Sequence, residues 1–306
     1  MDSINQRMGA REWALLVALA ILWGGSFFFV EIAIDAVSPL AIVFVRVALA
    51  AVALWVFSSV MGVSIPRGRA IWRAFAIMAV LNNVIPFSLI VWGQRDVGSA
   101  LASILNATTP FLTVLVAGAC LPDERMTTNR VIGVIIGFVG VVLVVGGHGV
   151  MHAGQNPAAP LAIIGAALSY ACAGVYGRRF KRLRINPIAV ATGQVTGSSL
   201  VLALLVGVSG SALPASNTAS TVWLALVGLG LLSTALAYIL YFQLLESAGA
   251  TNLLLVTFLI PAVATGLGVA VLGESLDATD YAGMALIGAG LLTVDGRALR
   301  AVLPGR

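Results

Sequence analysis

The residues best suited to chemistry in this sequence are polar side chains that interrupt long apolar segments. Arg46 lies inside one such segment. Asn82 and Asn83 lie together inside the next one, and Asn106 lies inside the one after that. A polar group in an apolar solvent is costly unless it pairs or faces water, so these side chains are expected to face one another or a cavity. A guanidinium attracts carboxylates, and amides donate and accept hydrogen bonds, so the set could bind a zwitterion.

Arg46 is open to more than one interpretation. It lies ~10 Å deep by the rise per residue of a helix, and Glu31 lies at a similar depth near the end of the preceding apolar segment. A structural Glu31–Arg46 ion pair is the first expectation, and a side chain that snorkels to the membrane surface is a variant of it. The alternative is a cavity charge that attracts the carboxylate of a ligand.

Prolines inside apolar segments predict helix bends at Pro86, Pro110 and Pro261. Pro86 shares a helix face with Asn82 and frees a backbone carbonyl, which an asparagine amide could satisfy. The alternative is a bent helix whose amides line a cavity. Asn106 begins a polar stripe that ends near Pro110, and one polar face indicates burial against protein or water rather than lipid.

Aromatic residues supply candidates for the apolar side of a site. Trp23, with Ser26 three residues later, lies in the middle of the first apolar segment, and Tyr170 lies in the middle of the sixth. Because Trp and Tyr prefer membrane interfaces, their position in mid-segment favours a cavity role. Tyr238 lies near the inner end of the eighth segment and fits either a cavity residue or the interfacial aromatic belt.

The composition identifies the solvent around these residues as lipid. Of 306 residues, 60% are hydrophobic and 9% are charged, and the mean hydropathy is +1.04. Soluble domains carry roughly 25% charged residues. The apolar runs are long and do not alternate, which favours helices over a β-barrel. The net charge of +5 is therefore attributed to cytoplasmic loops rather than to nucleic-acid binding.

Apolar runs long enough to span a bilayer predict ten transmembrane helices, at 13–34, 39–61, 70–92, 99–120, 130–147, 160–180, 187–208, 221–244, 251–272 and 281–297. With a cytoplasmic N-terminus, all 17 Lys and Arg residues except Arg46 and Arg95 fall in cytoplasmic segments. This positive-inside pattern predicts a multi-pass protein of a bacterial-type inner membrane with both termini in the cytoplasm.

The two halves of the chain repeat one another. Gly98 precedes Pro110 as Gly249 precedes Pro261, and Glu124 and Glu274 follow these prolines at similar spacing. Glycines recur in the fifth and tenth spans, at Gly133 and Gly140 and at Gly283 and Gly290, and predict a tightly packed scaffold or dimer surface. An odd number of spans in each half makes the second half inverted, a recurrent design of secondary transporters. Gln194 stands where Arg46 stands in the first half, so common helix packing does not require that charge.

These features together resemble the EamA family of the drug/metabolite transporter superfamily. They are Leu22-Trp23-Gly24, Arg46 in the second span, the Pro110/Glu124 and Pro261/Glu274 ends, and the glycine-rich fifth and tenth spans. The resemblance implies an all-α membrane protein, with ten transmembrane helices in two inverted five-helix repeats around a central cavity. The first repeat covers 1–147, an outer linker 148–159, and the second repeat 160–306. The family moves small metabolites, often amino acids, usually outward.

The favoured function is therefore a secondary transporter that exports small metabolites, with amino acids first, by alternating access. The cavity candidates are Trp23, Ser26, Arg46, Asn82, Asn83, Asn106, Tyr170 and Tyr238. A multidrug or organic-cation exporter is the alternative, although Arg46 disfavours cations. An integral membrane enzyme or receptor would need a nucleophile, an acid–base pair or a metal site, and we find none in the sequence. The expected partners are a small molecule and membrane lipids, and the expected state is a monomer or homodimer.

Several kinds of site are not expected. The sequence has no Walker-type loop for ATP hydrolysis, and we expect no nucleic acid, cofactor or catalytic residue. Cys120 and Cys172 lie in or at the end of apolar segments, which predicts neither a disulfide framework nor a metal site. His148 and His152 are spaced i, i+4 in a glycine-flanked outer segment, and we expect no metal there.

Overall fold

The structure is a computed structural model that describes residues 8–121, 127–151, 156–253 and 255–295. Within these residues every regular element is a helix, and there are no strands. The first half contains α1 (Ala10–Ala33), α2 (Pro39–Val60), α3 (Arg69–Ala79), the π-helix η1 (Val80–Val84), α4 (Ile85–Asn106), α5 (Thr109–Cys120) and α6 (Thr128–Met151). The second half contains α7 (Ala158–Arg182), α8 (Pro187–Ser209), α9 (Ser220–Val227), η2 (Gly228–Leu236), α10 (Ala237–Leu253), α11 (Val256–Leu267), η3 (Gly268–Leu272) and α12 (Ala278–Asp295).

Seven of these helical stretches are long and apolar enough to cross a membrane, judged by length and composition alone. Three shorter apolar helices, Thr109–Cys120, Val256–Leu272 and Ala278–Val294, correspond to the predicted fourth, ninth and tenth spans. The predicted boundaries differ most in the fourth span. Its first turns, Ser99–Asn106, are continuous with α4, and its remainder forms α5 after a break at Ala107 and Thr108. The fifth span is longer than expected, because α6 continues to Met151.

Two glycines turn the chain at equivalent places in the two halves. Gly98 has φ 72° and ψ 175° inside α4, and Gly249 has φ 77° and ψ 166° inside α10. A side chain at positive φ clashes with its own backbone, so glycine is the residue that accepts this conformation without strain. Each turn separates a long helix from a short helical segment of the following span.

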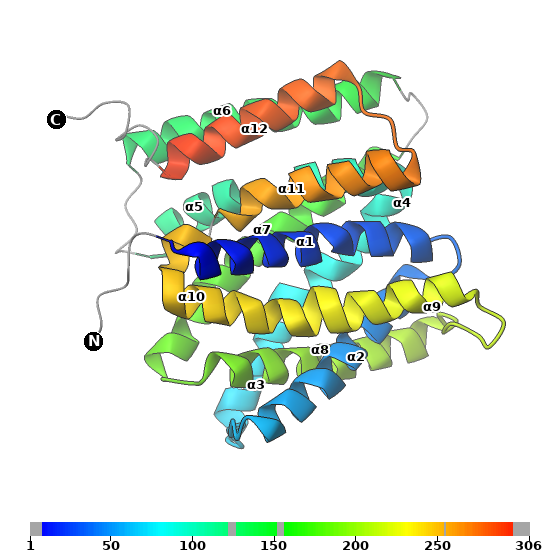
Figure 1. The fold of residues 1–306 in the computed structure, drawn as a ribbon, viewed down its shortest axis with the longest axis vertical. Coiled ribbons are helices and arrows are strands. Elements are labelled where there is room, and N and C mark those ends of the chain that lie inside the picture. The colour runs from blue at the N-terminus through cyan, green and yellow to red at the C-terminus, as the bar shows by residue number, and fades with distance from the viewer. Residues whose placement is uncertain (1–7, 122–126, 152–155, 254, 296–306) are drawn as a thin grey trace.

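Helices α6 and α12 pack against each other along one end of the bundle (Figure 1). A Cβ atom on Gly133 would lie 2.6 Å from the carbonyl oxygen of Gly290, and the reverse distance is also 2.6 Å. Gly140 and Gly283 approach each other in the same reciprocal way, at 2.7 Å in both directions. Small residues permit this close backbone contact in lipid, where dispersion forces replace the hydrophobic effect between helices.

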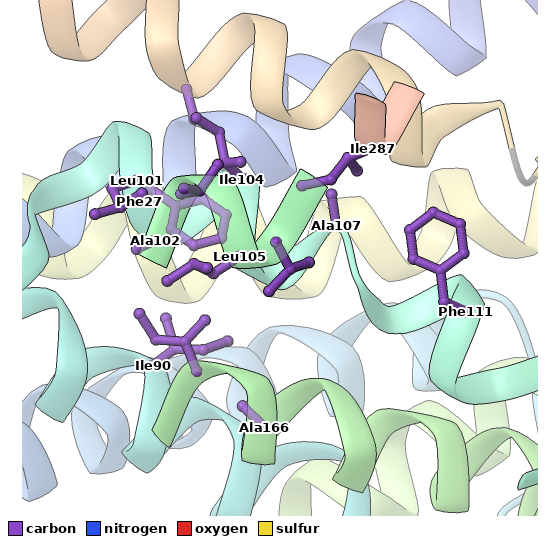
Figure 2. Packing of buried hydrophobic residues seen from close by; sticks show 14 of the residues in the cluster. Phe27, Ile90, Leu101, Ala102, Ile104, Leu105, Ala107, Phe111, Ala166 and Ile287 are labelled. Atoms are coloured by element: carbon purple, nitrogen blue, oxygen red, sulfur yellow. The ribbon is translucent and has the colours of Figure 1, made fainter. Parts of the chain in front are cut away.

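The remaining helices interleave the two halves. Helix α1 packs on α11, α2 packs on α8 and on η2, and α4 packs on α7. The apolar core at these contacts draws Phe27 from α1, Ile104 from α4, Ala166 from α7 and Ile287 from α12 (Figure 2). Helix α1 begins and α12 ends on the same side of the bundle (Figure 1).

Candidate functional site

Arg46 is buried between elements of both halves. Its side chain projects from α2 and is 7% exposed. The Nε atom donates a hydrogen bond to Thr234 Oγ1 at 2.9 Å, and Cζ lies 3.7 Å from the ring centroid of Phe87. Thr234 in turn donates its hydroxyl hydrogen to the carbonyl of Leu229 at 2.8 Å, five residues earlier in η2. The hydroxyl is thus fixed with a lone pair directed at the guanidinium.

The guanidinium of Arg46 retains binding capacity. It carries five N–H donors, and only the Nε–H donates to a protein acceptor in the described part of the chain. Across the same residues, no carboxylate lies within ion-pair distance of it. The face of Phe87 offers a weak cation–π contact, which is a partial substitute for a counterion. Its Nη groups are therefore the natural partner of an anionic group on a ligand.

A network of amide and hydroxyl groups lies one helical turn from the two residues that contact Arg46, Phe87 and Thr234. Tyr238 donates its hydroxyl hydrogen to Asn83 Oδ1 at 2.8 Å and accepts a hydrogen bond from Asn82 Nδ2 at 3.3 Å. Asn82 Nδ2 also donates to Gln194 Oε1 at 3.3 Å, and Asn83 Nδ2 donates to Ser198 Oγ at 2.9 Å. Each of these bonds joins the first half of the chain to the second.

The two groups are connected through two helices. Phe87 follows Asn83 by one turn of η1 and α4, and Tyr238 follows Thr234 by one turn of η2 and α10. We call the combined set the polar cluster; it comprises Arg46, Asn82, Asn83, Phe87, Tyr170, Gln194, Ser198, Thr234 and Tyr238. Tyr170 belongs to it through an edge-to-face contact with Phe87, at a centroid distance of 6.5 Å.

The cluster coincides with π-helical backbone. Asn82 and Asn83 lie in η1, and Thr234 lies in η2. A π-helical turn is rare and inserts one extra residue, which turns side chains out of the regular helical register and often marks a functional site. Here the two π-helices lie in corresponding spans of the two halves, the third and the eighth. Sequence reasoning missed Thr234, whose signal was a Ser-Thr pair inside an apolar run, and considered Gln194 only as the neutral counterpart of Arg46.

The structure does not bring Glu31 and Arg46 together. Glu31 Oε2 accepts a hydrogen bond from Gln94 Nε2 at 2.8 Å, and the same nitrogen donates to the carbonyl of Phe27 at 2.7 Å. Arg46 is directed instead toward η2 and α4. The predicted ion pair is therefore not formed, because equal depth in neighbouring helices does not place two side chains on facing surfaces.

The other predicted cavity residues lie outside the polar cluster. Trp23 contacts Tyr241, three residues after Tyr238, at a centroid distance of 5.6 Å, and so lies next to the cluster along α10. Ser26 donates to the backbone carbonyl of Trp23 at 2.8 Å. Asn106 is the last residue of α4, and its buried Oδ1 has no hydrogen-bond partner among the described residues.

The three prolines occupy different positions. Pro86 opens α4 directly after η1, and Pro110 opens α5 after the break that follows Asn106. Pro261 lies inside α11, which is helical from Val256 to Leu267, and the interruption of that span precedes Val256. The Asn82 amide donates to Gln194 and Tyr238 instead of the carbonyl that Pro86 frees.

Glu274 joins the ends of two distant segments. Its carboxylate accepts hydrogen bonds from Ser99 N at 2.7 Å, Ser99 Oγ at 2.6 Å and Ala100 N at 2.8 Å. These amides open the short helical segment that begins after Gly98, so the carboxylate caps a helix N-terminus. Its counterpart Glu124 lies outside the described residues.

Across the described residues, no three His, Cys, Asp or Glu side chains are grouped as a metal site. His152 lies outside these residues, and the side chain of His148 is also not described. Cys120 is exposed, Cys172 is half-buried, and neither forms a disulfide.

Comparisons of the sequence and of the structure with known proteins identify similar proteins. The profile of the EamA-like transporter family matches residues 11–146 and 158–294. A probable terminal-alkyne amino-acid exporter of Streptantibioticus cattleyicolor is 27% identical over 98% of this chain and 99% of its own. The uncharacterized inner membrane transporter YedA of Escherichia coli is 25% identical over 89% of this chain and 86% of its own. A solved crystal structure covers 97% of this chain and 100% of its own with a TM-score of 0.68 at 20% identity, which indicates a shared fold.

Proposed function

The chain belongs to the EamA-like transporter family, and from that premise we propose that it exports small metabolites, amino acids first, by alternating access. The family and the names of the relatives indicate membrane transport rather than catalysis. The name of the Streptantibioticus relative favours amino acids as the substrate class.

The observation that carries the proposal is the buried guanidinium of Arg46, which has no counterion among the residues that the structure describes. A buried charge is strongly disfavoured unless it is paired. A substrate carboxylate would supply the missing charge and accept hydrogen bonds from the Nη groups. The Gln194 and Asn83 side-chain oxygens lie in the neighbouring amide network and would accept hydrogen bonds from a substrate ammonium. A zwitterion thus complements both parts of the polar cluster, whereas an organic cation would be repelled by Arg46.

We also propose that the fold consists of two inverted five-helix repeats, 1–147 and 160–306, joined by an outer linker at 148–159. The family profile matches two consecutive segments, which supports the repeat. The reciprocal glycine contacts of α6 and α12 and the matching turns at Gly98 and Gly249 have the symmetry that such a repeat requires. The concentration of basic residues on one side supports cytoplasmic termini.

The position of the hydrogen bonds between the halves supports the proposal of alternating access. The halves are joined at the polar cluster by a few side-chain bonds between small polar groups, among them Asn83–Ser198 and Arg46–Thr234. Such bonds can be exchanged for bonds to a substrate at a modest net cost, since a neutral bond contributes about 1 kcal/mol and a bond to a charged group such as Arg46 about 1.5–3 kcal/mol. The halves can therefore rock about the α6–α12 contact while the cluster changes partners.

The test is flux in reconstituted vesicles. Purified protein in liposomes loaded with labelled amino acids is expected to release them faster than protein-free liposomes. The Arg46→Gln variant should lose this flux, and the exposed Arg95→Gln variant should retain it. Absence of protein-dependent flux across a broad panel of amino acids and other small metabolites would overturn the proposal.

A further inference from the structure

A cavity lies outside the polar cluster, between η1, α5 and α7. Its volume is about 440 Å³, within the range of small-molecule sites. Its lining includes the half-buried Leu81, Cys172 and Tyr176 and the exposed Cys120, Arg179 and Arg182. Helices α5 and α7 pack against each other, and Figure 1 shows α5 at the side of the bundle where α1 begins.

The cavity follows α7 over almost three turns. Cys172 and Arg182 both line it, and at 1.5 Å per residue they are separated by about 15 Å along the helix. Leu81 precedes Asn82 directly, and its carbonyl accepts a hydrogen bond from Ser169 Oγ at 2.7 Å. Tyr170 lies two residues before Cys172. The part of the cavity lined by Leu81 and Cys172 is therefore close in sequence to Asn82 and Tyr170 of the polar cluster, on η1 and on α7.

The mouth of the cavity is positively charged. Arg179 and Arg182 are exposed, and the Arg179 guanidinium lies 3.7 Å from the ring centroid of Tyr176, to whose hydroxyl it also donates a hydrogen bond. None of the side chains that line the cavity is acidic. The local field at the mouth thus favours anions, and a cavity with low-dielectric walls strengthens that preference.

We propose that this cavity is the cytoplasmic vestibule of the transport path, and that Arg179 and Arg182 select molecules with a free carboxylate before they reach Arg46. The inference rests on the proposed function, because only a transporter needs a route from the cytoplasm to the polar cluster. It adds the path by which the substrate reaches the polar cluster and the chemical group, a carboxylate, that is recognised on the way. The competing occupant is a lipid acyl chain, which would fill the cavity from the membrane side.

The chain itself supplies the probes, because its two cysteines, Cys120 and Cys172, both line the cavity. Single-cysteine variants Cys120→Ala and Cys172→Ala in inside-out vesicles expose the cytoplasmic face to charged thiol reagents. We expect an anionic methanethiosulfonate to modify Cys172 faster than a cationic one, by roughly threefold after normalisation to a free thiol in solution. Arg182→Gln and Arg179→Gln should each reduce this preference, and Lys181→Gln, an exposed neighbour outside the lining, should leave it unchanged.

Two results would overturn the vestibule. One is that a membrane-soluble maleimide labels Cys172 while neither charged reagent does, which would indicate a lipid-filled groove. The other is a preference for the anion that persists unchanged in both arginine variants. Labelling requires no flux, so selective labelling in a protein that moves no amino acid would refute the proposed function and leave the charge selectivity of the cavity standing.

Discussion

Tyr238 donates its hydroxyl hydrogen to Asn83 over 2.8 Å, and this bond connects the second half of the chain to the first at a π-helical turn. The same hydroxyl accepts from Asn82, so one phenol organises both asparagines. The polar cluster is thereby held in a defined arrangement next to the buried charge of Arg46.

The Tyr238→Phe variant is expected to lower stability. It leaves Asn83 Oδ1 unpaired in a fully buried side chain, which costs about 1–3 kcal/mol. Thermal unfolding of the purified protein in detergent measures the loss. Tyr241→Phe is the matched control, because no hydrogen bond of the Tyr241 hydroxyl is found within the described residues. Equal stability of the two variants would contradict the hydrogen-bond network.

Arg46→Met should abolish transport without destabilising the protein. Removing a buried charge that has no counterion in the described part of the chain relieves its desolvation penalty, and a methionine of similar length can pack on Phe87. We expect a melting temperature equal to or above that of the wild type, together with loss of flux. A large drop in melting temperature would show that Arg46 has a structural role.

Gly290→Ala is expected to destabilise the α6–α12 contact. The added Cβ would lie 2.6 Å from the carbonyl oxygen of Gly133, and the backbone shift that such overpacking forces lowers the stability of the folded state by about 1–3 kcal/mol. Gly288→Ala on the same helix is the control, since a Cβ there meets nothing within 4 Å. Thermal unfolding should separate the two variants, and similar melting temperatures would refute the close contact.

Glu274→Gln should weaken the contact with the segment that follows Gly98. The amide nitrogen cannot accept a hydrogen bond, so at least one of the bonds from Ser99 and Ala100 is lost, at a cost of about 2 kcal/mol. Glu246→Gln, at an exposed glutamate, is the control. If both variants unfold at the wild-type temperature, the carboxylate does not secure the helical segment that follows Gly98.

The sequence was sufficient to predict the family and the all-helical membrane fold, because apolar length and charge segregation are properties of the chain itself. It also pointed to Arg46, Asn82, Asn83, Tyr170 and Tyr238, which the structure brings into one cluster, because polar groups in apolar segments need partners. Their cavity role remains a proposal. Which partner each polar group finds depends on which surfaces of the helices pack together. This is why Arg46 contacts Thr234 rather than Glu31.

Local helix irregularities were beyond sequence reasoning. Pro86 and Pro110 suggested bends, but they did not indicate that a π-helix precedes Pro86 or that the helix breaks at Ala107 and Thr108 before Pro110. Tyr238 was equally compatible with the aromatic belt, because depth in the membrane does not reveal the direction of a side chain. Only its bonds to Asn82 and Asn83 place it inside the bundle.

The central claim is that Arg46 binds the carboxylate of an exported amino acid, and paired flux measurements test it directly. Liposomes containing the protein are loaded with a labelled amino acid or with the amine that remains when its carboxylate is removed. We expect protein-dependent release of the amino acid at least tenfold faster than that of the amine, and loss of this difference in Arg46→Gln. Equal release of both compounds by the wild type, or an unchanged preference in Arg46→Gln, would contradict the claim.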